Sequence, residues 1–187
     1  MRVWSERSFE APVPMHVKRS IILRLGLPNA TWIETGTYLG DTTGLLAAQG
    51  GPVISIEPAA VLATRAAERF RGNPLVKIVC GTSEERLASE LARVHGDVNF
   101  WLDGHFSGGA THRGVSECPV RSELNCIAAA RPRLGRLRVL IDDARHFGCG
   151  ESRRPDYPPL DELVDWARTQ RLLWHIESDI FVMRSDD

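Results

Sequence analysis

Short apolar runs alternate with stretches of helical periodicity along the chain, and this alternation predicts an α/β fold. Five of the apolar runs have the length of buried strands, and glycine, proline or polar residues bound them. They cover residues 31–35, 52–58, 75–80, 98–102 and 137–141. Because strands that alternate with helices pair through right-handed crossovers, we predict a mainly parallel sheet.

The stretches between these runs place apolar residues three and four positions apart, which is the spacing of one helix face. We predict helices at 15–25, 42–49, 59–70, 84–94, 120–130 and 160–169. Two further apolar runs, 172–176 and 180–183, predict an antiparallel hairpin at the sheet edge. The segment 148–159 holds three prolines and several charges, so we expect an exposed loop there.

With 187 residues the chain suits one domain with one core. The predicted fold class is α/β: a single Rossmann-like, doubly wound, mainly parallel sheet with a C-terminal antiparallel hairpin. Residues 1–30 would form an N-terminal cap segment, whose helix packs on the sheet or covers the site. Residues 31–187 would form the Rossmann-like core.

Composition and charge are those of an ordinary globular protein, with 43% hydrophobic residues, 25% charged residues and a net charge of −1. Proteins that bind nucleic acid through its phosphates usually have a basic excess, so we expect no nucleic-acid partner. No run approaches the apolar length that spans a bilayer, and the N-terminal residues are charged where a signal peptide would be apolar. We therefore expect a cytoplasmic protein without a membrane partner, and a homodimer stays open.

The four cysteines show no CxxC spacing, which favours reduced thiols over a disulfide framework. They are Cys80, Cys118, Cys126 and Cys149. A zinc site that gathers the last three with a histidine stays open as an alternative, although no ligand pair has zinc-finger spacing.

The stretch 31–43, TWIETGTYLGDTT, joins a predicted strand to a helix through a glycine turn. Ligands of open α/β sheets bind at such turns, where backbone N–H groups are free and glycine allows close approach. The spacing is ExGxxxG instead of the dinucleotide pattern GxGxxG, with Tyr38 in place of a second close glycine. Because Glu34 adjoins the turn, a cationic ligand is favoured over a pyrophosphate. S-adenosylmethionine has both a sulfonium and an ammonium group.

Carboxylates follow four of the five predicted parallel strands, and these strand ends lie along one edge of a parallel sheet. They are Glu34, Glu57, Asp103 and the pair Asp142 and Asp143. Any one of them has an alternative role as a cap of the next helix or turn, but together they predict a site. Glu57 is placed to accept hydrogen bonds from ribose hydroxyls. The last three would repel one another unless a cation such as Mg²⁺ neutralised them.

Five motifs in this order, ETGTYLGDTT, VISIEP, GTSEERL, FWLDGH and VLIDD, resemble those of class I S-adenosylmethionine-dependent methyltransferases. More narrowly, the chain resembles the metal-dependent O-methyltransferases of the catechol and macrolide-sugar type over residues 31–143. The resemblance implies that Glu57 binds the ribose and that Thr82, Ser83 and Glu84 lie near adenine. The full set of predicted cofactor residues is Glu34, Gly36, Thr37, Tyr38, Gly40, Thr42, Glu57, Gly81, Thr82, Ser83 and Asp103.

The same resemblance implies that Asp103, Asp142 and Asp143 bind the metal, although the catechol enzymes have Asp-Asn at the last pair. Those enzymes also have a lysine general base shortly after the fourth-strand aspartate, whereas no lysine follows Asp103 in this chain. A histidine titrates near neutral pH and can replace it, as in the macrolide-sugar relatives. We predict His105 as the base, with Asp103 and His146 as further catalytic residues and His112 as an alternative.

The predicted function is therefore S-adenosylmethionine-dependent, Mg²⁺-assisted methyl transfer to a hydroxyl of a small molecule, such as a sugar, a phenol or a natural-product intermediate. Two alternatives stay open. One is a catalytically silent S-adenosylmethionine-binding module, and the other is a different nucleotide-cofactor enzyme, such as an oxidoreductase, on the same scaffold. The glycine-rich loop after Asp103 and the loop near Tyr157 are expected to contact the substrate. Trp101 is expected to be core.

Overall fold

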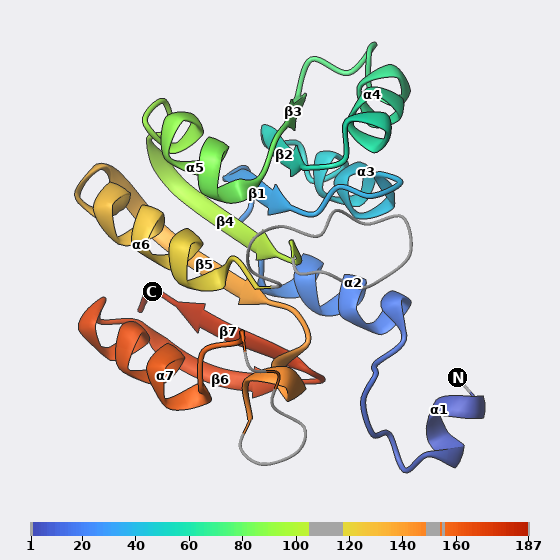
Figure 1. Ribbon diagram of the computed structural model, residues 1–187, viewed down its shortest axis with the longest axis vertical. Coiled ribbons are helices and arrows are strands. Elements are labelled where there is room, and N and C mark those ends of the chain that lie inside the picture. The colour runs from blue at the N-terminus through green and yellow to red at the C-terminus, as the bar shows by residue number, and fades with distance from the viewer. Residues whose placement is uncertain (1, 105–117, 149–153, 155, 187) are drawn as a thin grey trace.

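A computed structural model describes residues 2–104, 118–148, 154 and 156–186 of the chain. Its centre is a sheet of seven strands in the order β3-β2-β1-β4-β5-β7-β6 (Figure 1). The strands are β1 Thr31–Thr35, β2 Val53–Glu57, β3 Val76–Cys80, β4 Gly96–Leu102, β5 Leu134–Ile141, β6 Leu173–Glu177 and β7 Ile180–Arg184. Strands β1 to β5 are parallel, and β7 pairs antiparallel with both β5 and β6. The predicted parallel sheet and its C-terminal hairpin are thus confirmed.

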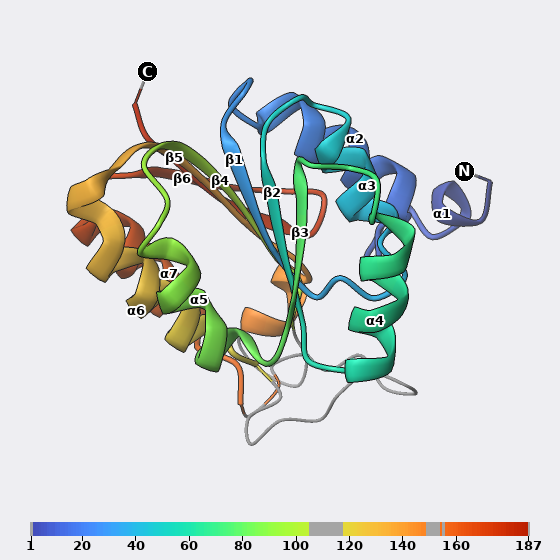
Figure 2. The same ribbon diagram turned by 90° about the horizontal axis from the view of Figure 1, so that it is seen from above.

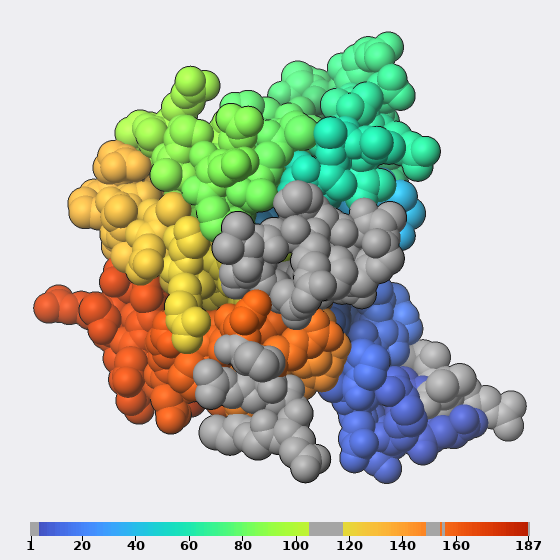
Figure 3. Space-filling model, viewed as in Figure 1, coloured from blue at the N-terminus to red at the C-terminus, as the bar shows by residue number. Residues whose placement is uncertain are grey.

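Helices cover both faces of the sheet, which confirms the doubly wound prediction. Figure 2 shows α2 Met15–Leu25, α3 Asp41–Ala47 and α4 Ala60–Arg69 on one face. The other face is covered by α5 Ser83–Leu91, α6 Val120–Ala130 and α7 Leu160–Thr169. The side chains of these last three helices follow one another across the face seen in Figure 3. A short helix, α1 Arg2–Glu6, lies apart from the sheet.

Two apolar clusters hold these layers together, one on each face of the sheet. Neighbouring residues of one strand belong to different clusters, because successive side chains of a strand point to opposite faces. Phe100 packs in the cluster beneath α5 to α7, whereas Trp101 packs with Trp32 beneath α2 and α3. All three side chains are buried, which confirms the expected core position of Trp101. Apolar residues on both faces explain why the central strands are nearly continuous apolar runs.

The N-terminal segment packs on the sheet, as expected, through one face of α2. Lys18, Ile21 and Ile22 are buried on this face, at the spacing that aligns side chains along a helix. The two isoleucines join Trp32 in the apolar cluster. No helix in the described part of the chain is long and apolar enough to span a membrane.

The expected exposed loop at 148–159 is wrong in one respect. Tyr157 is fully buried, and its ring packs edge to face against Phe147, at 5.1 Å between centroids. Phe147 ends the 3₁₀ turn Ala144–Phe147 that follows β5. The aromatic pair therefore joins the end of this loop to the core, a tertiary contact that the proline and charge content of the loop did not indicate. Residues 149–153 and 155 lie outside the described residues.

Candidate functional site

The four central strands end at the same level, so the residues that follow them meet at one edge of the sheet. Thr35 pairs with Ile56 on one side and with Leu102 on the other, and Leu102 pairs with Ile141. The ladder continues one step further, because Asp103 N donates to Thr35 O at 3.1 Å. Asp142 N likewise donates to Leu102 O at 3.1 Å. The acid that ends β2 and the acids that follow β4 and β5 thus start from adjacent backbone positions.

The glycine turn after β1 passes very close to the end of β4. Gly36 has a φ of +88°, and a Cβ atom there would lie 2.4 Å from the Asp103 carbonyl oxygen. Gly40 has a φ of +80°, and a Cβ there would lie 2.8 Å from the Phe70 ring. Only glycine meets both the conformation and the close approach. Between them Tyr38, with a φ of +49°, is 53% exposed at the edge of the sheet.

Glu34 lies beneath this turn and is fully buried. Its Oε2 atom accepts hydrogen bonds from Thr43 Oγ1 at 2.5 Å and Ser55 Oγ at 2.6 Å. Thr37 Oγ1 lies 2.6 Å from the same Ser55 hydroxyl. The network ties β1 and β2 to α3 and to the turn. The predicted cofactor residues Glu34 and Thr37 are therefore engaged in holding the turn.

Burial raises the pKa of Glu34 from its ordinary value of 4.5 to about 7. The Ser55 and Thr43 hydroxyls oppose this rise by donating to the carboxylate, the Glu57 charge adds to it, and the Arg19 charge opposes it. In the described residues Glu34 Oε1 is buried without a hydrogen-bond partner, which is consistent with a carboxyl group that holds its proton.

Glu34→Gln is expected to make stability less dependent on pH. The unfolded chain loses the Glu34 proton near pH 4.5 and the folded chain only near pH 7, so the folded state binds more protons in between. The free energy of unfolding of the natural protein should therefore fall as the pH rises across this window, by on the order of 3 kcal/mol. Glutamine does not titrate, so the variant should gain that amount relative to the natural protein. Urea unfolding at pH 5 and pH 8 measures it.

The matched control is Glu68→Gln, at an exposed position of α4. It should leave the pH dependence of unfolding unchanged. An equal pH dependence in Glu34→Gln and the natural protein would contradict a buried, proton-holding Glu34.

Glu57 is the last residue of β2, at the edge of the glycine turn, and is itself buried. Its Oε2 atom accepts a hydrogen bond from Tyr38 N at 2.8 Å, and its Oε1 atom accepts one from Ala59 N at 2.9 Å. Each carboxylate oxygen has two lone pairs, so each can accept a second bond from a ligand hydroxyl. The two backbone donors fix the carboxylate beside the turn.

The turn after β3 lies next to Glu57. Gly81 N donates to Glu57 O at 3.0 Å, with a φ of +137° at Gly81. Thr82 caps α5 in a capping box with Glu85. Ser83 begins the helix and is buried. The structure therefore brings the predicted adenine residues to the same edge as Glu57, but it uses the Thr82 side chain to cap the helix.

Lys18 occupies the space between the two acids that follow β5. Its Nζ atom lies 2.5 Å from Asp142 Oδ1 and 2.9 Å from Asp143 Oδ1. Asp143 also accepts a hydrogen bond from Arg145 Nη1 at 2.8 Å, and the same atom pairs with Asp179. Burial alone would lower the pKa of Lys18, but the charges of Asp142 and Asp143 outweigh it and raise that pKa. The acids thus have cations supplied by the chain itself.

The predicted metal site of Asp103, Asp142 and Asp143 is not supported by this arrangement. Among the described residues, no three histidine, cysteine, aspartate or glutamate side chains are grouped as a metal site. The same holds for the zinc alternative as far as Cys118 and Cys126 are concerned, and neither of them forms a disulfide. Cys149 lies outside the described residues.

The histidines predicted for proton removal are only partly placed by the structure. His146 lies in the 3₁₀ turn directly after the acid pair, half-buried, with its ring 5.5 Å from that of Tyr157. Asp103 is half-buried at the end of β4. His105 and His112 lie outside the described residues, so their roles stay predictions.

Sequence reasoning missed the buried polar residues around the site: Lys18, Thr43, Ser55 and Arg145. Lys18 could have been found from the sequence, because its spacing places it on the same helix face as two isoleucines. A lysine on an apolar face is rarely buried unless it is paired, so this position indicates an acidic partner. Ser55 could have been found too, because it interrupts the apolar strand VISIE. The remaining two are recognisable only from the contacts of the folded chain.

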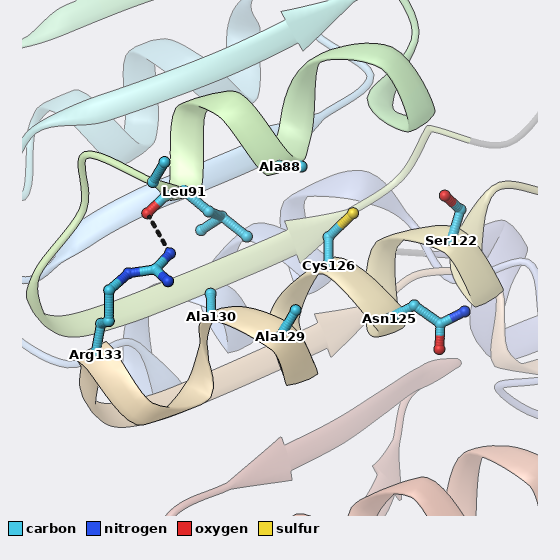
Figure 4. Close-up of a pocket in the computed structure, with 9 residues that line it drawn as sticks. Ala88, Leu91, Ser122, Asn125, Cys126, Ala129, Ala130 and Arg133 are labelled. Atoms are coloured by element: carbon cyan, nitrogen blue, oxygen red, sulfur yellow. Dashed lines mark hydrogen bonds between the residues drawn. The ribbon is translucent and has the colours of Figure 1, made fainter.

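An open groove lies between α5 and α6, away from this site (Figure 4). Small side chains such as Ala88 and Ala129 line it, and Arg133 Nη2 donates across it to Leu91 O at 3.4 Å. Because these helices run antiparallel to the strands, their C-terminal ends at Leu91 and Ala130, and Arg133 in the 3₁₀ turn that follows α6, lie toward the opposite sheet edge. The groove is therefore separate from the residues after β1, β2, β4 and β5.

The topology and the glycine turn define a Rossmann-like fold, and solved structures of several methyltransferases have a similar fold. The O-methyltransferase from Bacillus cereus in complex with SAH has a TM-score of 0.61 at 15% identity, and the match covers 98% of this chain and 86% of that one. The N-methyltransferase NodS from Bradyrhizobium japonicum has a TM-score of 0.58 at 13% identity, over 92% and 97%.

An rRNA methylase from Streptococcus thermophilus has a TM-score of 0.51 at 14% identity, over 94% of this chain and 96% of that one. The sequence matches no family model and no curated protein. At these identities the structural likeness shows the fold alone. Since the three similar structures differ in their methyl acceptors, the fold does not indicate the acceptor of this chain.

Proposed function

We propose that the protein binds S-adenosylmethionine and transfers its methyl group to a hydroxyl group of a small molecule. The observation that supports this best is the Glu57 carboxylate, which Tyr38 N and Ala59 N hold beside the glycine turn. A fixed pair of carboxylate oxygens at the end of the second strand suits the two hydroxyls of a ribose. Gly36 and Gly40 let the turn pass against the Asp103 carbonyl and the Phe70 ring, where any Cβ atom would clash.

The residues present fit the cofactor. Glu57 would hold the ribose, the backbone of 36–40 would lie along the methionine part, and Gly81 to Ser83 would border the adenine. When bound, the cofactor supplies an electrophilic methyl group. The protein would contribute by holding the two reactants in line and by excluding water from the edge of the sheet. Glu34 would act indirectly, because its hydrogen bonds to Thr43 and Ser55 keep the turn in shape.

The acceptor is proposed to be a small molecule because the charge of the chain is balanced, at −1. An RNA substrate would call for a basic surface. The acceptor would lie beside the residues after β4 and β5, near Asp103, Asp142 and His146. His105 as the general base stays a prediction, and His146 is a described histidine directly after the acid pair.

Assistance by Mg²⁺ also stays a prediction from the sequence, and the residues after β5 do not fit it. An ion would need oxygen atoms of Asp142 and Asp143, and the Lys18 ammonium lies within 2.9 Å of both. The Mg²⁺ ion binds at about 2.0–2.1 Å from oxygen and would face that positive charge at close range. We therefore derive no step through a metal.

Titration calorimetry with S-adenosylmethionine tests the cofactor part of this proposal. We expect one site per chain with micromolar affinity, and no detectable binding of NAD under the same conditions. Transfer of a labelled methyl group to sugars, phenols and ribosomal RNA then tests the acceptor. Absence of cofactor binding at millimolar concentration would overturn the proposal. Binding with no transfer to any acceptor would favour a silent cofactor-binding module instead.

A further inference from the structure

We propose that the ammonium group of Lys18 takes the place of a divalent cation at the acids after β5, so that this site works without a metal ion. In this role Lys18 is a positioning residue that holds Asp142 and Asp143 and provides positive charge at the acceptor end of the sheet. The consequence of this replacement for methyl transfer rests on the proposed function. Its consequence for the binding of metal ions is independent of that function.

The first support is the geometry of the pair. Lys18 Nζ lies 2.5 Å from Asp142 and 2.9 Å from Asp143, so one ammonium bridges two adjacent carboxylates, as a metal ion would. The lysine is 4% exposed and Asp142 is 3% exposed. A buried lysine is rare unless it is paired, and this one has two partners. The Lys18 side chain is therefore held in one position as part of the site, unlike a surface lysine that samples many rotamers.

The second support is the way in which the fold fixes this lysine. Ile21 and Ile22, one turn further along α2, are buried against Trp32 of β1. This packing holds the helix on the sheet and aims position 18 at the end of β5. The chain has only one other lysine, Lys77, which is half exposed and pairs with Glu90. The chain thus has one of its two lysines at this buried position, and all its other basic residues are arginine or histidine.

The third support is the local balance of charge. Asp142, Asp143 and Asp179 face Lys18 and Arg145, and Arg145 Nη1 pairs with both Asp143 and Asp179. Three carboxylates thus meet two cations from the chain. A divalent ion added to this set would be repelled by the ammonium, and the ammonium would lose both partners if it withdrew. The chain itself therefore supplies most of the positive charge that these acids need.

Removal of the ammonium should create a metal site. Lys18→Met keeps much of the side-chain volume but leaves the two carboxylates without their bridging charge. Binding of Mn²⁺, followed by its electron paramagnetic resonance signal in chelator-treated protein, is the measurement. The natural protein should bind Mn²⁺ with only millimolar affinity at this site. The variant should bind one ion at least about tenfold more tightly, and Asp142→Asn added to it should reverse the gain.

Two further variants separate charge from structure. Lys18→Arg keeps a positive charge at the position and should not gain Mn²⁺ affinity. Lys77→Met removes the other lysine and should behave as the natural protein. The Mn²⁺-binding measurement needs neither cofactor nor acceptor, so its results can be interpreted even if the proposed function is wrong.

Labelling of the two lysines by acetic anhydride keeps the proposal testable if Lys18→Met does not fold. In the natural protein, mass spectrometry should find Lys77 modified at least about tenfold faster than Lys18, equally with chelator and with millimolar Mg²⁺. Three results would overturn the proposal: tight Mn²⁺ binding by the natural protein that Asp142→Asn removes, a folded Lys18→Met without a gain in Mn²⁺ affinity, or Lys18 labelling that Mg²⁺ increases.

Discussion

Gly36→Ala is expected to destabilise the protein by about 3 kcal/mol or more and to remove cofactor binding. Two costs add at this position. A side chain at a φ of +88° costs about 1–2 kcal/mol, and the new Cβ would lie 2.4 Å from the Asp103 carbonyl oxygen, which must move. Because that carbonyl belongs to the end of β4, the shift would separate the glycine turn from the acceptor side of the site. Urea unfolding and calorimetry with S-adenosylmethionine measure the two effects.

Two other glycines serve as matched controls for Gly36. Gly96 has a φ of +79° but open space around its missing Cβ, so Gly96→Ala should show the conformational cost alone. Gly72 has neither a positive φ nor a neighbour within 4 Å, so Gly72→Ala should change stability little. Equal losses in Gly36→Ala and Gly96→Ala would contradict the close approach of the turn to β4.

Hydrophobic periodicity predicts most of the fold, because burial on one or both faces decides where strands and helices form. It gives α2, β1, α6 and α7 with the bounds that the structure has, and the other predicted elements within a few residues, but it does not predict the short helix α1 or the 3₁₀ turns. Boundaries shift where polar residues extend an element. Strand β5 begins at Leu134 instead of 137, since Arg136 N and its guanidinium pair with Asp97 of β4. Such a pairing between distant polar residues has no periodic signature.

For the candidate site as well, topology predicts one part and tertiary contacts decide the other. Parallel topology alone brings Glu57, Asp103 and Asp142 to one edge, so their convergence is predictable from strand order. Which of them is available to a ligand depends on contacts that the sequence does not show. Glu34 satisfies two hydroxyls of the fold itself, and Asp142 pairs with Lys18, which lies more than a hundred positions earlier in the chain.

This division explains why the magnesium prediction and the structure differ. Three converging carboxylates predict a cation, and that physical argument holds. It does not say whether the cation is an ion or a side chain. Lys18 and Arg145 supply positive charge to Asp142 and Asp143 in the described structure, and both come from positions that the acid pattern alone does not select.

Glu57→Ala is expected to lower the affinity for S-adenosylmethionine by at least about 100-fold. The variant loses the carboxylate that would accept two ribose hydroxyls, and hydrogen bonds to a charged acceptor contribute about 1.5–3 kcal/mol each. It also frees Tyr38 N and Ala59 N, so the turn loses its fixed position.

Glu57→Gln keeps one acceptor oxygen and should lose less affinity for S-adenosylmethionine. Glu68→Ala on the exposed side of α4 is the matched control and should bind as the natural protein does. Affinity within about threefold of the natural value in a folded Glu57→Ala would place the ribose elsewhere, and with it the cofactor.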